Sequence, residues 1–119
     1  MSELAKPLGP YTPIVRSGDW LVVSGQLGMK DGALVDGGVS AETTQAVANL
    51  KTQLESEGAR LDHIIKTTVF LTNMDDFAAM NDAYIAAFGD HRPARSTIGV
   101  AALPLPGAVV EIEAWARLA

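Results

Sequence analysis

Two segments of the chain place hydrophobic residues at the three- and four-residue spacing of amphipathic helices. The first lies between Ser40, a residue type that caps helix N-termini, and Gly58, a type that follows helix C-termini. The second is predicted from about Asp75 to Phe88 and ends at Gly89, and its hydrophobic stripe consists of Phe77, Met80, Tyr84 and Phe88. The sequence therefore predicts two helices, each with one face available for a core.

The β-rich segments are shorter and are separated by turn-forming residues. A turn cluster at residues 17–19 predicts a hairpin whose second strand begins at Trp20. Further strands are predicted at Ile64 to Leu71, Ser96 to Ala101 and Val109 to Leu118, whereas the glycines between residues 25 and 38 predict turns. In the last strand, hydrophobic residues at even positions alternate with Glu111, Glu113, Trp115 and Arg117.

The predicted element order is β-β-α-β-α-β-β in a single domain over residues 1–119, because no linker, repeat or low-complexity tract divides the chain. This order indicates the α+β fold class, with two helices on one face of a mixed sheet. The other face carries Trp115 and further hydrophobic residues beside charges, and no predicted element covers it. Such a face commonly packs against another subunit, so the sequence predicts an oligomer.

Composition narrows the function classes. Nine basic and fourteen acidic residues give a net charge of −5, which disfavours nucleic acid as a partner. The absence of cysteine excludes disulfides, thiolate catalysis and sulfur-ligated zinc, and His63 and His91, which lack metal-ligand spacing, are expected at the surface. No segment is long and apolar enough to span a membrane, and the start lacks the layout of a signal peptide. We therefore expect a cytoplasmic protein with no membrane partner.

A few polar residues stand at positions that admit two interpretations each. Arg95, just before a strand, is either an exposed edge residue or a guanidinium fork that binds a carboxylate. Glu111 and Glu113 lie either on a solvated face or, if that face is buried against a subunit, opposite a partner such as Arg95. Tyr11 is either a hydrogen-bonding lid over a site or an aromatic residue that only packs. Asn81 is either a structural amide or an amide that lines a pocket.

Taken together and in this order, several segments resemble the Rid family, also called the YjgF family, and its RidA-type members in particular. The resemblance runs from Gly9 to Ala116 and is carried by Gly9-Pro10-Tyr11, Val23–Gln26, Lys66–Leu71, Pro93–Ser96, Leu103-Pro104 and Val110–Ala114. It implies a chorismate-mutase-like α+β domain that forms a homotrimer with a small-molecule pocket at each subunit interface. It also implies hydrolysis of reactive 2-enamine and 2-imino acids, such as 2-aminoacrylate and 2-iminopropanoate, to 2-keto acids and ammonia, without cofactor or metal.

The resemblance also implies roles for individual residues. Arg95 matches the arginine that binds the substrate carboxylate, and Glu111 matches the glutamate that positions the attacking water. The implied substrate-binding residues are Tyr11, Ser24, Gly25, Asn81 and Thr97. Thr97 stands where many members carry cysteine, and because the backbone carbonyl is the group implied to hold the water there, threonine is compatible with activity.

Two alternative functions belong to other classes. A non-catalytic trimer that senses small carboxylates would need Arg95 but not Glu111. An endoribonuclease or translation inhibitor, an activity described for some family members, is disfavoured by the acidic composition and the lack of a basic stripe.

Overall fold

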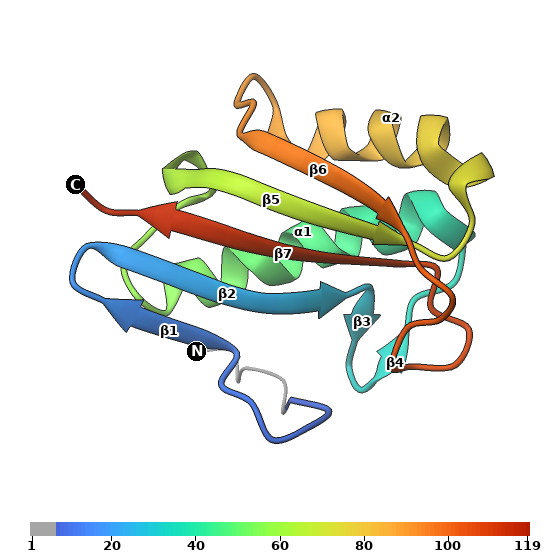
Figure 1. The fold of residues 1–119 in the computed structure, drawn as a ribbon, viewed down its shortest axis with the longest axis horizontal. Helices are drawn as coiled ribbons and strands as arrows, with labels where there is room; N and C mark the ends of the chain where they lie inside the picture. Colours follow the sequence, from blue (N-terminus) through green and yellow to red (C-terminus); the bar gives the residue numbers. More distant parts are fainter. Residues whose placement is uncertain (1–6) are drawn as a thin grey trace.

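A five-stranded mixed sheet and two helices on one of its faces make up the fold (Figure 1). The computed structural model describes residues 7–119, so the start of the chain, where no signal peptide is expected, lies largely outside the described residues. The elements are β1 (Ile14–Ser17), β2 (Trp20–Leu27), β3 (Met29–Lys30), β4 (Ala33–Leu34), α1 (Gly38–Glu55), β5 (Ile64–Leu71), α2 (Phe77–Phe88), β6 (Ala94–Gly99) and β7 (Val110–Arg117).

The strand order in the sheet is β1-β2-β7-β5-β6. Only β5 and β6 run parallel, with α2 as the crossover between them, and the other neighbours are antiparallel. The small β3–β4 hairpin forms a separate two-stranded sheet. This arrangement confirms the predicted α+β fold with two helices on one face of a mixed sheet.

The core lies between the sheet and the helices. The even-numbered residues of β7 point into it, as the alternation predicts, and all four of them are fully buried. They pack with residues of the two predicted helix stripes, among them Val47, Leu50, Leu54, Met80, Tyr84 and Phe88. Removing this apolar surface from water is the main favourable contribution to folding.

The helix ends differ from the predictions in detail. Helix α1 begins at Gly38, two residues before Ser40, and the preceding residue is Gly37 with φ of 115°. Gly37 and Gly38 both adopt positive φ, which lets the chain turn into the helix early and makes the predicted Ser40 cap wrong. At the other end, α-helical geometry stops at Glu55, and the chain turns away at Gly58, which has φ of 76°.

Three other predicted bounds also shift. The chain enters α2 through a 3-10 turn at Met74–Asp76, which the Asn73 side chain caps by accepting from the Asp75 N–H at 2.9 Å, so α2 itself begins at Phe77. Strand β6 begins and ends two residues earlier than predicted, because its pairing with β5 sets its bounds. Strand β7 is one residue shorter at each end.

The two histidines are less exposed than predicted. His63 accepts a hydrogen bond from the Arg60 N–H at Nδ1, at 2.9 Å, and ends the 3-10 turn that precedes β5. The Nε2 atom of His91 lies 2.7 Å from the Ile64 carbonyl oxygen, which ties the loop after α2 to the start of β5. Both side chains therefore have structural hydrogen bonds.

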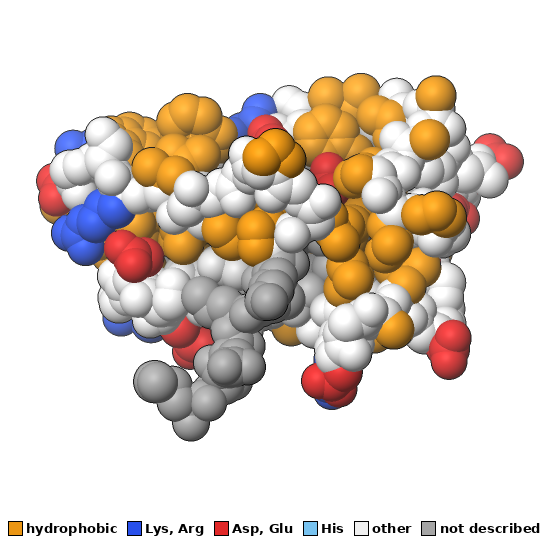
Figure 2. Space-filling view, turned by 90° about the horizontal axis from the view of Figure 1, so that it is seen from below, with side chains coloured by type: hydrophobic (Ala, Val, Ile, Leu, Met, Phe, Trp, Pro, Cys, Tyr) orange, Lys and Arg blue, Asp and Glu red, His pale blue; other side chains and the backbone are white. Residues whose placement is uncertain are grey.

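The sheet face away from the helices, called the open face below, is uncovered in the single chain. It presents Val15, Trp20, Ile98 and Trp115, all more than a third exposed, and the two indole rings meet edge to face at 6.3 Å. Figure 2 shows hydrophobic side chains gathered in patches on the surface seen from below, with most charged side chains toward the periphery. Among the described residues, no helix has the length and hydrophobicity needed to cross a membrane.

Candidate functional site

Glu111 lies on the open face, because its neighbours Val110 and Ile112 point into the core. Its carboxyl group rests directly on Gly25 of β2, where a bulge shifts the register between β2 and β7. A Cβ atom at Gly25 would lie 2.7 Å from the carboxyl carbon of Glu111, closer than non-bonded atoms approach. Glycine at position 25 is therefore what lets the Glu111 side chain lie flat on the sheet.

Ser24, next to this glycine, holds the preceding loop against β2. Its hydroxyl donates to the Thr12 carbonyl at 2.7 Å, and its N–H donates to the Pro13 carbonyl at 2.8 Å. The loop carries Tyr11, whose hydroxyl accepts from the Leu8 N–H at 3.2 Å and whose side chain is 45% exposed. We call Tyr11, Ser24, Gly25 and Glu111 the glutamate half of the site.

The electrostatics of the glutamate half disfavour its charge. Burial raises the pKa of Glu111 above its usual value of 4.5, and the nearby Glu113 carboxylate raises it further. Within the described part of the chain, no basic side chain offsets these two effects. The Glu111 carboxyl is therefore a partly buried acidic group that has no cationic partner among residues 7–119.

Arg95 lies on the helix side of the sheet. In the parallel register β6 places Arg95 beside Thr67 of β5, and Thr67 is fully buried under the helices. The guanidinium is half-buried, with its carbon 4.9 Å from the centre of the Tyr84 ring and 5.6 Å from that of Phe77. One nitrogen, Nη1, lies 3.8 Å from the Met80 sulfur. These contacts hold the guanidinium by cation–π attraction while leaving donors available.

A hollow of about 320 Å³ opens beside this guanidinium, and its lining residues are Asn81, Tyr84, Ile85, Arg92, Pro93 and Arg95. Asn81 Oδ1 is buried there without a hydrogen-bond partner among the described residues. Thr97 points to the same side of β6 as Arg95, two residues further along. We call Asn81, Arg95 and Thr97, with the hollow between β6 and α2, the arginine half of the site.

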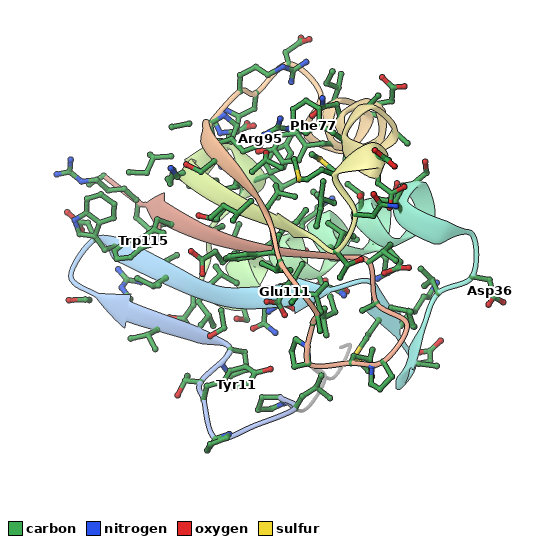
Figure 3. All side chains as sticks on the ribbon, turned by 45° about the vertical axis from the view of Figure 1, so that its right-hand side comes forward. Tyr11, Asp36, Phe77, Arg95, Glu111 and Trp115 are labelled. Atoms are coloured by element: carbon green, nitrogen blue, oxygen red, sulfur yellow. The ribbon has the colours of Figure 1, made fainter. Side chains whose placement is uncertain are left out.

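The structure thus divides the residues predicted for the site into two groups. Figure 3 shows Arg95 beside Phe77, near β6 and α2, whereas Glu111 lies over the middle of the sheet and Tyr11 on the loop that leads into β1. Within one chain Arg95 and Glu111 point to opposite faces, so the direct pairing considered for them does not form there. Sequence reasoning placed Phe77, Met80 and Tyr84 on a core stripe and missed that they seat Arg95.

Sequence reasoning also missed Glu42, which lies on the helix side of the sheet and contacts the strand that carries Glu111. This residue of α1 is 3% exposed, and its Oε1 atom accepts from the Val109 N–H at 2.9 Å, just before β7. Burial raises the pKa of Glu42, and hydrogen bonds from the Val109 and Val110 backbone partly counteract this. A buried carboxylate thus fixes the start of the strand that carries Glu111.

Within residues 7–119, no group of three or more histidine, aspartate and glutamate side chains is placed to hold a metal ion. The two halves offer a guanidinium that binds a carboxylate and a carboxylate that accepts a proton from water.

Comparison with known proteins finds a matching family, similar sequences and similar solved structures. The family described as endoribonuclease L-PSP matches residues 1–118. A RutC family protein of Pyrococcus horikoshii is 41% identical over 113 residues, 93% of this chain and 89% of that protein. A 2-iminobutanoate/2-iminopropanoate deaminase of Dermatophagoides farinae is 41% identical over 110 residues, 91% of this chain and 85% of that protein. The crystal structure of E. coli TdcF with bound serine matches with a TM-score of 0.88 and 33% identity, covering 95% and 91% of the two chains.

Proposed function

Because the chain belongs to the endoribonuclease L-PSP family, which includes the YjgF and RidA proteins, we propose that it hydrolyses 2-imino acids and their enamine tautomers to 2-keto acids and ammonia. The observation that carries the proposal is the pair of half-sites, one with a guanidinium and one with a carboxyl group, each lacking its counterpart. Relatives named 2-iminobutanoate/2-iminopropanoate deaminase support the reaction class.

The complete site forms between two chains. Arg95 and Glu111 point to opposite faces of one sheet, so a substrate that touches both must lie between the arginine half of one protomer and the glutamate half of the next. Two different surfaces then meet at each interface, and such a heterologous contact closes into a ring when the rotation between neighbouring chains is a whole fraction of a full turn. We propose a homotrimer with three such sites, which also covers the hydrophobic open face.

The reaction needs orientation and one activated water. Arg95 binds the substrate carboxylate through its guanidinium fork and presents the electrophilic imine carbon to a water held by Glu111. Glu111 accepts a proton as the water oxygen bonds to that carbon and passes it to the imine nitrogen, which gives a carbinolamine. It then accepts the carbinolamine hydroxyl proton and delivers it to the nitrogen, as the carbon–oxygen double bond forms and the carbon–nitrogen bond breaks. The products are the 2-keto acid and ammonia, and the carboxylate is regenerated.

The remaining residues of the two halves shape the pocket. Gly25 leaves room for the carboxyl group of Glu111, and Ser24 fixes the loop that carries Tyr11. Asn81 lines the hollow beside Arg95, and Thr97 faces the same side of β6 as Arg95.

The test couples an amino-acid oxidase, which releases 2-iminopropanoate or 2-iminobutanoate, to a trap such as semicarbazide that reports the remaining imine. We expect the protein to reduce the trapped imine in proportion to its concentration, and the Arg95→Ala variant to reduce it far less. If the parent protein leaves imine decay at its spontaneous rate for every imino acid supplied, the proposed reaction is wrong.

A sensor of small carboxylates is the competing function, and the serine bound to the TdcF relative shows that a related protein holds a small ligand. The Glu111→Gln variant separates the two functions. An enzyme loses turnover with this change, whereas a sensor binds its carboxylate through Arg95 as before.

A further inference from the structure

The hollow beside Arg95 contains a second guanidinium, which the proposed reaction does not use. Arg92 lies between α2 and β6 and lines the same hollow as Arg95. Its Nη1 atom donates to the carbonyl oxygens of Gly89 and His91, at the C-terminal end of α2. These two acceptors orient the guanidinium at the rim of the hollow, where the Arg92 side chain is exposed to solvent.

Hydrogen bonds to the backbone at the end of α2 use only part of the donor capacity of the Arg92 guanidinium. A guanidinium has five N–H donors in a planar fork, and the two backbone contacts engage only Nη1. The Nε and Nη2 donors remain available for an anion. A role limited to helix capping would also be met by a lysine or histidine at this position, since those residue types interact well with helix C-termini.

Arg92 and Arg95 line the same hollow beside Tyr84, and no carboxylate among the described residues forms an ion pair with either of them. Burial raises the pKa of the Tyr84 hydroxyl, and the hydrogen bond with Thr67, then Arg95 and then Arg92 partly offset this by lowering it. Among residues 7–119, the recorded contacts of the two guanidiniums are backbone carbonyls, a thioether and aromatic rings, with no carboxylate. The hollow therefore carries two uncompensated positive charges in a protein whose net charge is −5.

We propose that this hollow selects 2-imino acids with an acidic side chain, the substrate carboxylate binding at Arg95 and the side-chain carboxylate at Arg92. The inference rests on the proposed function and specifies its substrate class. A four-carbon dicarboxylate such as 2-iminosuccinate offers one carboxylate for each guanidinium, whereas an alkyl imino acid offers only one. At about 320 Å³, the hollow is at the lower end of the size range of small-molecule pockets, roughly 300–1,000 Å³.

The experiment compares two substrates of equal carbon number, 2-iminosuccinate from an aspartate oxidase and 2-iminobutanoate from a general amino-acid oxidase. We expect the parent protein to have the higher kcat/KM for 2-iminosuccinate. The Arg92→Gln variant should lower that value roughly ten- to hundredfold, the range for losing a hydrogen bond to a charged group. The same variant should leave 2-iminobutanoate within about twofold, because that substrate does not reach Arg92.

A matched control is Arg16→Gln, which removes one charge from an arginine that also donates to a backbone carbonyl, that of Gly18, but lies in the β1–β2 hairpin. It should change neither rate. If Arg92→Gln lowers both substrates equally, the residue only supports α2, and the inference is wrong. A parent protein that prefers 2-iminobutanoate overturns it as well.

A binding measurement keeps this inference separate from the proposed reaction. Calorimetric titration with succinate and with butanoate requires no turnover, and we expect succinate to bind more tightly to the parent and to lose that advantage in Arg92→Gln. If neither imine is hydrolysed faster than spontaneously but succinate is still preferred, the reaction is wrong and the selectivity stands. Equal or weaker binding of succinate overturns the selectivity.

Discussion

The arginine half and the glutamate half are both carried by every chain, yet they stabilise their charged groups in opposite ways. In the arginine half the aromatic rings of Phe77 and Tyr84 attract the guanidinium, so the chain itself holds the positive charge in place. In the glutamate half, burial and the neighbouring Glu113 raise the pKa of Glu111, so the chain disfavours the negative charge. One half is ready to bind an anion, and the other is a carboxyl group that readily takes up a proton.

The difference shows how the work of the proposed reaction is divided. A group that anchors a carboxylate must remain charged at all times, and arginine beside aromatic rings does so. A group that accepts a proton from water and returns it must not be too weak a base, and a raised pKa strengthens it. Placing the halves on opposite faces keeps the two charges from neutralising each other within one chain.

The largest changes in activity are expected for one variant in each half of the site, measured first separately and then in a mixture of the two variant proteins. Arg95→Ala and Glu111→Gln should each lose about 100-fold or more in activity, since truncating one side of a buried charged contact costs about 2–5 kcal/mol and losing a general base costs about 10²–10⁴-fold. In an equimolar mixed assembly, about a quarter of the sites pair an intact arginine with an intact glutamate across the heterologous interface. Activity should therefore return to about that fraction, measured by imine trapping.

The control for this mixture is Arg95→Ala combined with the double variant Arg95→Ala/Glu111→Gln, in which no site is intact. It should remain inactive. Recovery in the control, or none in the test mixture, would contradict a site shared between chains.

Gly25→Ala should damage the glutamate half alone. The added Cβ would lie 2.7 Å from the Glu111 carboxyl and force that side chain to move, so we expect at least about a tenfold loss of kcat while carboxylate binding at the arginine half persists. Steady-state kinetics together with butanoate titration checks both parts. Gly99→Ala is the control, because its nearest neighbour is the flexible Met74 side chain at 3.1 Å, and its activity should match the parent.

Glu42→Ala tests the buried support behind the glutamate half. It leaves the Val109 N–H without its acceptor, and we expect the free energy of unfolding to fall by about 1–3 kcal/mol in urea titrations. Glu42→Gln retains an oxygen acceptor and should lose less. Equal losses in the two variants would show that the hydrogen bond to Val109 contributes little.

The same residue predicts a pH effect. Because the pKa of Glu42 is raised on folding, the folded chain binds its proton up to a higher pH than the unfolded chain. The stability of the parent should therefore fall as pH rises from about 4.5, the usual value, through the raised one. The Glu42→Gln variant should lack this contribution to the pH dependence.

The smallest effect is expected from Glu113→Gln, which removes the second cause of the raised Glu111 pKa. Glu111 must be ionised to accept a proton, so the activity of the parent should fall on the acid side at a pH above that of an ordinary carboxyl group. Removing Glu113 lowers the pKa of Glu111 and should move this acid limb to lower pH. A pH profile of kcat/KM checks it, and an unmoved limb would assign the limb to another group.

The parts of the fold that rest on repeating patterns were predictable from sequence. The stripe of α2 and the alternation in β7 report burial directly, which is why the open-face position of Glu111 follows from its neighbours alone. The β3–β4 hairpin was missed although the turn residues Asp31 and Gly32, both with positive φ, form the dipeptide that commonly closes two-residue hairpins. That signal was present in the sequence.

The face that Arg95 occupies could not be predicted, because β6 is short and its sequence, Ala94–Gly99, shows no alternation between hydrophobic and polar residues. Its orientation is set by the parallel register with β5, a contact between segments about thirty residues apart. The acceptor that Glu42 provides for Val109 is likewise a contact between distant segments, 67 residues apart along the chain. Such contacts leave no periodic pattern in the sequence.

Because Arg95 and Glu111 lie on opposite sides of one sheet, the rate of turnover per chain should depend on protein concentration. A single protomer contains both Arg95 and Glu111, but the two side chains cannot contact the same substrate molecule. Turnover per chain should then decline on dilution below the concentration at which subunits associate, and it should return when the solution is concentrated.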